Sequence, residues 1–241
     1  MFFTIQPTGL QNTLTYSNLN NMINKTELLK ALLQESGAEP ESEPAAFFMA
    51  GLPGSGKTEI SKNLIKDSGV NLFRIDMDEI AERLPGYTPE KADEFRKPAT
   101  SILSNCFSYA LHHNISFLLD GTFGSPQALK NIERSLNHGF KVQIVYALQD
   151  PKLAWKFTVA REKVEHRAIQ FNGFINAYYK TISNLQTVIK LYGRQIAIDI
   201  AVKDENNKVG KWLRSVKASE FDEIVKVEYN KNKLIQYITG E

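Results

Sequence analysis

The chain is poor in cysteine and histidine, the residue types that most often build disulfides and metal sites. Its single cysteine, Cys106, cannot form an intramolecular disulfide, and no Cys-x-x-Cys or zinc-type spacing surrounds it. We therefore expect Cys106 to be a small buried hydrophobic residue. Only four histidines are present, and the adjacent His112 and His113 would point about 100° apart on a helix. The histidines therefore predict no dedicated metal site.

Long apolar runs and a strong net charge are also missing. No segment approaches the roughly 20 apolar residues that a transmembrane helix needs, and residues 1–7 lack the basic and apolar regions of a signal peptide. The 29 basic and 27 acidic side chains leave a formal charge of only +2, which creates no strong field for nucleic acid or a membrane surface. We expect a cytoplasmic protein that binds neither nucleic acid nor membrane.

The chain does contain a motif that cradles phosphates: Gly51, Leu52, Pro53, Gly54, Ser55, Gly56, Lys57 and Thr58. It lies between a strand-like apolar run and a helix-like run at 59–66, which is the context that the motif requires. The three glycines let consecutive N–H groups curl around a polyphosphate, and the next helix directs its positive end at the same anion. All eight residues are predicted to bind the nucleotide, with Lys57 on the terminal phosphates and the Thr58 hydroxyl on Mg²⁺.

Apolar runs alternate with helical patterns from residue 45 onward. The predicted strands are 45–51, 70–76, 115–120, 141–148 and 196–203. With 241 residues, of which 42% are hydrophobic, the chain can bury one full core. The alternation predicts an α/β fold of the P-loop kinase type, with a mostly parallel sheet and helices on both faces. Helix starts are predicted at Ser125-Pro126 and Asp150-Pro151, each with a capping side chain before a proline at the first helical position.

Residues 1–44 differ from the rest of the chain. They are polar, contain one predicted helix at 25–35, and end in an acidic, proline-containing run at 37–44 that is typical of a linker. We therefore expect an N-terminal extension and linker in residues 1–44 and one P-loop domain in 45–241. The pattern in 212–238 mixes helical and strand-like features and gives no assignment.

Two carboxylates follow the predicted strand 70–76. Asp76 and Glu79 stand in an Asp-x-x-Glu arrangement, which favours Asp76 as the N-cap of a helix over 79–84. Asp78 is left over by that explanation and lies beyond a strand that should neighbour the phosphate loop. There it could accept the proton of an attacking hydroxyl, or it could be an ordinary first-turn acid that the helix dipole stabilises.

The predicted strand 115–120 also ends in a carboxylate, followed by glycine and threonine. Asp120 has the position of a Mg²⁺-side acid in phosphate-loop enzymes, although a strand followed by Asp-Gly also describes many turns. A cation over the migrating phosphate could come from the charged segment 155–167. Arg161 and Arg167 are the candidates, while Arg161 also has the spacing of a surface ion pair with Glu165.

Taken together, the phosphate loop and the segments 75–78, 120–122 and 155–167 resemble the zeta toxin family, over about residues 45–205. Zeta toxins are phosphate-loop kinases of toxin–antitoxin systems, and family members phosphorylate UDP-N-acetylglucosamine with ATP and Mg²⁺. The resemblance implies an ATP-dependent kinase in which Asp78 is the base, Asp78, Asp120 and Thr122 line the substrate site, Thr58 and Asp120 hold Mg²⁺, and Lys57, Arg161 and Arg167 stabilise the phosphates.

The chain departs from the family pattern in two places. Asp120-Gly121-Thr122 stands where the family has Glu-Gly-Thr, so the carboxylate is shorter by one methylene. The two arginines are also closer in sequence than the family pattern implies.

Several alternatives stay open at the level of sequence. A P-loop kinase for another metabolite or an antibiotic would share the scaffold, and a nucleotide-dependent switch or ATPase would share the phosphate loop. No Asn-Lys-x-Asp guanine-binding motif occurs in residues 59–241, which disfavours a GTPase switch. The expected partners are a small-molecule substrate and either an antitoxin protein or residues 1–44 acting as a built-in restraint.

Overall fold

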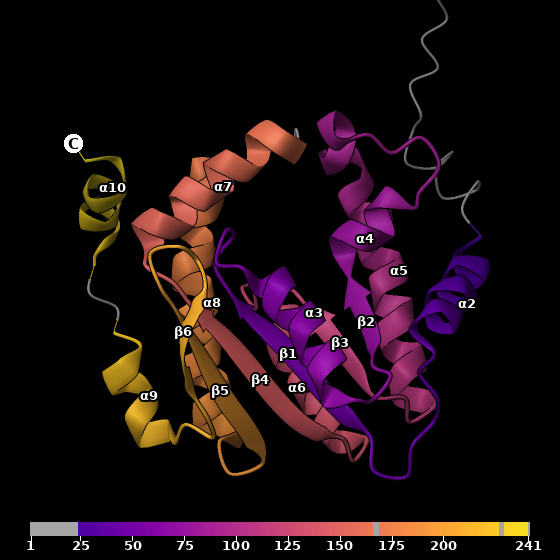
Figure 1. The fold of residues 1–241 in the computed structure, drawn as a ribbon. Helices are drawn as coiled ribbons and strands as arrows, with labels where there is room; N and C mark the ends of the chain where they lie inside the picture. The colour runs from indigo at the N-terminus through magenta and orange to yellow at the C-terminus, as the bar shows by residue number, and fades with distance from the viewer. Residues whose placement is uncertain (1–23, 166–168, 227–228, 241) are drawn as a thin grey trace, which may run out of the picture.

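A six-stranded sheet forms the centre of the molecule (Figure 1). The computed structural model describes residues 24–165, 169–226 and 229–240. In spatial order the strands are β2 (Phe73–Asp76), β3 (Phe117–Asp120), β1 (Ala45–Gly51), β4 (Lys141–Leu148), β5 (Ile196–Lys203) and β6 (Val209–Leu213). The first five are parallel, and β6 pairs antiparallel with β5. The strand that leads into the phosphate loop, β1, is therefore an inner strand of the sheet.

Helices cover both faces of this sheet, as predicted. They are α2 (Lys25–Ser36), α3 (Lys57–Ser68), α4 (Met77–Glu82), the short 3₁₀ helix η1 (Pro89–Lys91), α5 (Ala92–His112), α6 (Gln127–Asn137), α7 (Pro151–Glu165), α8 (Phe171–Tyr192), α9 (Ala218–Ile224) and α10 (Lys231–Thr239). Phe48 of β1 points into the larger apolar core, which includes residues of α5, α6 and α8. Its neighbour Met49 points to the opposite face, where it packs with Ile60 of α3.

The observed bounds of β1, β4 and β5 agree with the predicted strands, and those of β2 and β3 agree less closely. The predicted strands 45–51, 141–148 and 196–203 are confirmed, whereas β2 begins at Phe73 and β3 at Phe117, later than predicted. The residues before β3 are engaged elsewhere. Ile115 forms an isolated antiparallel bridge with Pro40, and the Ser116 hydroxyl accepts a hydrogen bond from the N–H of Ala45 at 2.9 Å. The Ser116 carbonyl oxygen still accepts a hydrogen bond from the N–H of Phe73 at 3.0 Å, just before β2 and β3 pair.

The described part of the N-terminal extension packs against the domain. Leu29 of α2 and Ala38 lie in the large core, and Arg83 forms a two-pronged ion pair with Glu35 (2.7 and 2.5 Å). The acidic run continues along the amino ends of the strands, where Glu41 accepts a hydrogen bond from Ser116 at 2.9 Å. Residues 40–41 therefore contact the amino end of β3, whereas α2 packs beside β2 and α5 and reaches the residue after α4.

The C-terminal tail, which the sequence left unassigned, forms β6, α9 and α10. Helix α10 reaches the start of α7, where the Tyr237 hydroxyl donates a hydrogen bond to Asp150 Oδ2 at 2.7 Å. The other carboxylate oxygen of Asp150 accepts from the N–H of Leu153 at 2.9 Å. Asp150 therefore caps α7 as predicted, and it joins the last described helix to the first turn of α7.

The Ser125 side chain caps the start of α6 as predicted, because its hydroxyl accepts from the N–H of Gln127 at 3.2 Å. The helix begins at Gln127, one residue later than the predicted first position, Pro126. Cys106 is fully buried, as predicted, and burial raises the pKa of its thiol to about 12. Within the described ranges, no helix combines the length and the apolar character needed to cross a bilayer.

Candidate active site

The phosphate loop connects β1 to α3 and has the backbone conformation that its glycines allow. Gly51, Gly54 and Gly56 all have positive φ (144°, 75° and 74°). No side chain caps α3, whose N-cap is Gly56, so the N–H groups of its first turn remain directed at the loop. Lys57 Nζ donates a hydrogen bond to the carbonyl oxygen of Leu52 at 2.5 Å. The side chain of the loop lysine thus folds back over the loop.

Helix α7 rests directly on the phosphate loop. A Cβ on Gly54 would lie 2.1 Å from the carbonyl oxygen of Ala154 and 2.5 Å from the hydroxyl oxygen of Thr158, and both residues are buried. The first half of α7 is therefore fixed against the loop. Its second half, which carries the exposed Arg161, extends beyond the loop toward solvent.

A buried charge cluster joins the carboxyl ends of β2 and β3. Asp76 and Asp120 are partners in the parallel register of these strands, and Arg74 NH2 lies 2.6 Å from one carboxylate oxygen of each. The Arg74 side chain is only 10% exposed, and its NH1 group pairs with Glu79 of α4. Ser61 of α3 donates to Asp120 Oδ2 at 2.7 Å. One guanidinium therefore holds three carboxylates from two strand ends and a helix.

Sequence reasoning missed Arg74 and Ser61. Arg74 alternates with apolar residues in β2, as a solvent-facing strand residue would, and Ser61 lies on the buried side of α3. Only the strand register, which brings Asp76 beside Asp120, explains why a cation is needed there. Burial and the neighbouring Asp120 carboxylate raise the pKa of Asp76 to about 6, and the Arg74 charge opposes this rise.

Asp76 is also the N-cap of α4, as predicted. Its Oδ1 accepts hydrogen bonds from the N–H groups of Asp78 (2.7 Å) and Glu79 (3.4 Å). The predicted capping box is not completed, because the Glu79 carboxylate pairs with Arg74. With Asp76 as the cap, α4 begins at Met77 and Asp78 lies in its first turn, half-buried at the carboxyl end of β2.

The electrostatic environment of Lys57 shows which predicted site residues come together. Burial lowers the pKa of its ammonium group to about 8; Asp120, Asp78 and Asp76 oppose this shift, and Arg161 adds to it. Residues from β2, β3, α4 and α7 therefore surround the loop lysine, although they are far apart in the sequence. Arg167, the second predicted lid residue, lies outside the described residues.

The segment after β3 is fastened to the phosphate loop and to α8. The Thr122 carbonyl oxygen accepts from the N–H of Gly51 at 3.2 Å and from the hydroxyl of Thr181 at 2.8 Å. The next residue, Phe123, has a φ of 64°, and Asn184 donates to its carbonyl oxygen at 2.8 Å. Thr122 therefore lies beside the entrance of the loop, at the same sheet end as Asp120.

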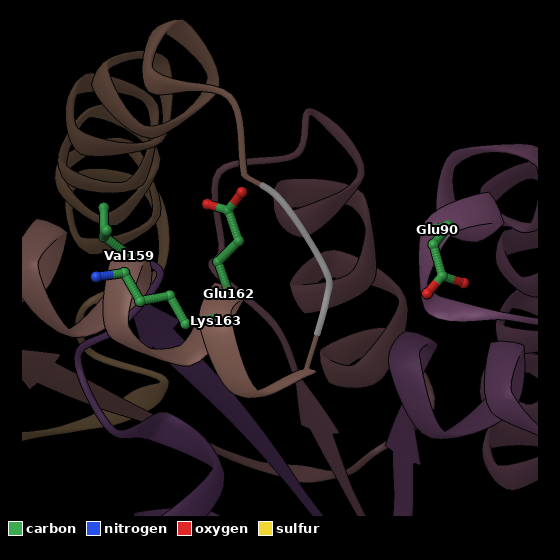
Figure 2. A pocket seen from close by; sticks show the side chains of 4 residues that line it. All are labelled: Glu90, Val159, Glu162 and Lys163. Atoms are coloured by element: carbon green, nitrogen blue, oxygen red, sulfur yellow. The ribbon is translucent and has the colours of Figure 1, made fainter.

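An open cleft of about 420 Å³ lies between the outer part of α7 and the segment before α5. Val159, Glu162 and Lys163 line it on α7, and Glu90 of η1 faces them across the gap (Figure 2). Arg161 belongs to the same turn of α7. Three of the four residues that line the cleft are charged.

A metal ion at this site would need ligands beyond the protein. In the described parts of the chain, no cluster of three or more His, Cys, Asp or Glu side chains could hold a metal ion. Mg²⁺ commonly binds through one or two protein oxygens together with substrate phosphates and water. The Thr58 hydroxyl and the Asp120 carboxylate are oxygen donors of the type that fits this arrangement.

Comparisons with known proteins identify the family of the chain and agree with its fold. A family model described as "Zeta toxin" matches residues 30–217. No curated protein matches the sequence significantly. Among solved structures, the chain is similar to one from the PezAT chromosomal toxin–antitoxin system of Streptococcus pneumoniae, with 18% identity, a TM-score of 0.67 and coverage of 94% of this chain and 95% of that chain.

A second similar structure is a chain of the AvrRxo1-ORF1:AvrRxo1-ORF2 complex, with 15% identity, a TM-score of 0.58 and coverage of 87% of this chain and 75% of that chain. At these identities the solved structures show the fold alone. The family match covers most of the chain, from α2 to the residue before α9.

We expect Gly54→Ala to damage both stability and nucleotide binding. A side chain in the left-handed region costs about 1–2 kcal/mol, and the added Cβ would also collide with α7. Urea denaturation should show a loss of at least about 2 kcal/mol in the free energy of unfolding, and calorimetry should show MgATP affinity falling more than about tenfold.

Gly173→Ala in α8 is the matched control, because no atom lies within 4 Å of its added Cβ. This variant should keep the stability and affinity of the unmodified protein or gain slightly in stability. A Gly54→Ala variant that behaves like Gly173→Ala would show that α7 does not rest on the loop in solution.

Proposed function

Because this chain belongs to the zeta toxin family, we propose that it is an ATP-dependent kinase that phosphorylates a hydroxyl of a sugar nucleotide, UDP-N-acetylglucosamine. The observation that carries the proposal is the set of charges around Lys57. The Asp78 carboxylate, which we assign to the acceptor side, and the Arg161 guanidinium, which we assign to the lid, both influence the pKa of the phosphate-loop lysine. A kinase needs these groups around the transferred phosphoryl group, whereas a nucleotide switch has no use for the acceptor-side base.

In the proposed reaction, the acceptor hydroxyl oxygen attacks the γ-phosphorus of ATP and its proton moves to the Asp78 carboxylate. The bond between the γ-phosphorus and the β–γ bridging oxygen breaks, and ADP leaves with that oxygen. Lys57 and Arg161 stabilise the negative charge on the phosphoryl oxygens during transfer. Arg167, from the segment after α7, is proposed to contribute a second cation.

Mg²⁺ would neutralise part of the phosphate charge, with the Thr58 hydroxyl and Asp120 as its protein ligands. Asp120 is held in place for this role, because Arg74 and Ser61 both bind its Oδ2 atom. Its side chain is one methylene shorter than glutamate. The Asp120 side chain is also only 4% exposed, which suits a carboxylate that acts at the back of the site.

The acceptor is proposed to enter between α7 and η1, where the charged cleft opens. Asp78 and Thr122 would face it from the carboxyl ends of β2 and β3. The choice of UDP-N-acetylglucosamine rests on the family, since no group in the cleft by itself selects a uridine or an N-acetyl group. If another metabolite or an antibiotic is the acceptor, the assignment as a kinase stands and only the substrate changes.

Incubation of the protein with ATP, Mg²⁺ and UDP-N-acetylglucosamine should yield ADP and a phosphorylated sugar nucleotide, detected by a coupled assay and by mass spectrometry. Lys57→Met should lower kcat/KM at least about a hundredfold, because the phosphate-stabilising ammonium is lost. Lys66→Met, an exposed residue of the same helix, is the matched control and should retain activity. If product forms with another metabolite and not with UDP-N-acetylglucosamine, the proposed acceptor is wrong. If Lys57→Met turns over at the rate of Lys66→Met, the assignment of the active site is wrong.

Asp78→Asn should lower kcat by roughly 10²- to 10⁴-fold while the Kd for MgATP stays unchanged, because only the proton acceptor is removed. Single-turnover kinetics and calorimetry measure the two quantities separately. Glu82→Gln, an exposed acid at the end of the same helix, controls for the loss of charge. An Asp78→Asn variant with unchanged kcat would favour the nucleotide-switch alternative.

A toxic kinase needs a restraint. Of the two similar structures described above, one comes from a toxin–antitoxin system and the other from a complex of two different chains. Residues 40–41 contact the amino end of β3, and α2 packs beside β2 and α5, so we propose that a separate antitoxin protein supplies the restraint. Deleting residues 1–23 should then leave kcat within about twofold of the full chain and leave growth inhibition in cells unchanged, with the same deletion in Lys57→Met as the inactive control. A severalfold rise in kcat on deletion would instead assign the restraint to the chain's own N-terminus.

A further inference from the structure

Lys203 is a buried cation that the site described above does not use. It is the last residue of β5, and its side chain is 0% exposed. Among the described residues its ammonium group has no hydrogen-bond partner; it forms an ion pair with Glu59, whose Oε2 lies 3.8 Å away, beyond hydrogen-bonding distance. A buried ammonium group without a hydrogen bond is costly, so its position calls for a ligand.

This ammonium group lies against the phosphate loop. Nζ is 2.8 Å from the place that a Cβ on Gly56 would occupy. The turn after β5 is fastened to the same loop, since Asn207 Nδ2 donates to the carbonyl oxygen of Gly54 at 3.2 Å. Gln149 in turn donates to Asn207 Oδ1 at 3.2 Å and to the carbonyl oxygen of Asp204 at 3.0 Å. Lys203 is therefore held at the loop by a hydrogen-bonded support.

The strand order indicates which end of a bound nucleotide lies near Lys203. The groups that act on Lys57 at the phosphate-transfer end include Asp76 and Asp120, from β2 and β3, on one side of β1. Lys203 comes from β5, on the other side of β1. A nucleotide bound with its γ-phosphate toward the β2–β3 side would direct its ribose and base toward the β5 side.

We infer that Lys203 is a further nucleotide-binding residue, whose ammonium group donates a hydrogen bond to the ribose or base of the phosphate donor. The inference rests on the proposed function only in that the loop binds a nucleoside triphosphate. Burial lowers the pKa of Lys203, and Glu59 and Asp204 oppose this shift, so the nearby carboxylates favour the charged donor form. A bound nucleoside would supply the acceptor that the cation lacks.

A structural role and a ligand-binding role predict opposite effects of Lys203→Met on the nucleotide-free protein. If the ammonium group serves to bind a ligand, methionine removes a buried charge that has no hydrogen bond, and the melting temperature should rise. If the ammonium group instead holds the fold together, the melting temperature should fall. Lys208→Met, an exposed lysine in the same hairpin, is the matched control for the loss of one positive charge.

Calorimetric titration without acceptor separates the nucleoside from the phosphates. For Lys203→Met we expect the Kd of MgATP to rise at least about tenfold and the Kd of magnesium tripolyphosphate to stay within about twofold. Lys208→Met should leave both values unchanged. The expected pattern is a higher melting temperature together with weaker MgATP binding; where the methionine variant does not fold, Lys203→Gln serves in its place with the same expected change in Kd.

Three results would overturn the inference: an unchanged MgATP Kd, an equal rise in the Kd of tripolyphosphate, or a lower melting temperature. Failure of the proposed acceptor is a separate result, because binding is measured without acceptor. A chain that binds MgATP through Lys203 but does not phosphorylate UDP-N-acetylglucosamine would refute the sugar-nucleotide kinase and leave the assignment of Lys203 intact.

Discussion

The position of the candidate site depends on one guanidinium placed between two strand-end carboxylates. Asp76 and Asp120 end neighbouring parallel strands, and little solvent reaches either side chain. Without a cation, two buried like charges at this separation would repel each other or force one carboxylate to take up a proton. Arg74 reduces this conflict. It thereby fixes the ends of β2 and β3, the start of α4 and so the place of Asp78 in the fold.

The glycines of the phosphate loop serve the protein as well as a phosphate ligand. Helix α7 presses on the loop at Gly54, and the ammonium group of Lys203 reaches it at Gly56. A Cβ at either position would collide with a neighbouring segment. The loop thus contacts α7, the helix after β4, on one side and Lys203, the last residue of β5, on another. Tertiary packing therefore sets the shape of the loop in addition to the backbone freedom of its glycines.

The sequence predicts those features that depend on local chemistry. The phosphate loop, three strands, the Asp76 cap and the burial of Cys106 are each encoded within a few residues, and the structure confirms them. The charge cluster around Arg74 depends on the register between β2 and β3, which no local pattern reveals. The sequence does not reveal Lys203 for the same reason, since this residue lies beside a loop about 150 residues earlier in the chain. The roles of Asp78, Asp120 and Arg161 in catalysis stay predictions.

The hydrogen bond between Tyr237 and Asp150 connects the end of the chain to the helix that carries Arg161. Because the same carboxylate caps α7, a pull on α10 acts on the first turn of α7, close to the place where that helix presses on the phosphate loop. Helix α10 is therefore connected through Asp150 to the helix that rests on the phosphate loop. A substitution in α10 that moves Tyr237 would therefore be expected to change the position of α7 over the phosphate loop, although α10 itself lies far from the loop in sequence.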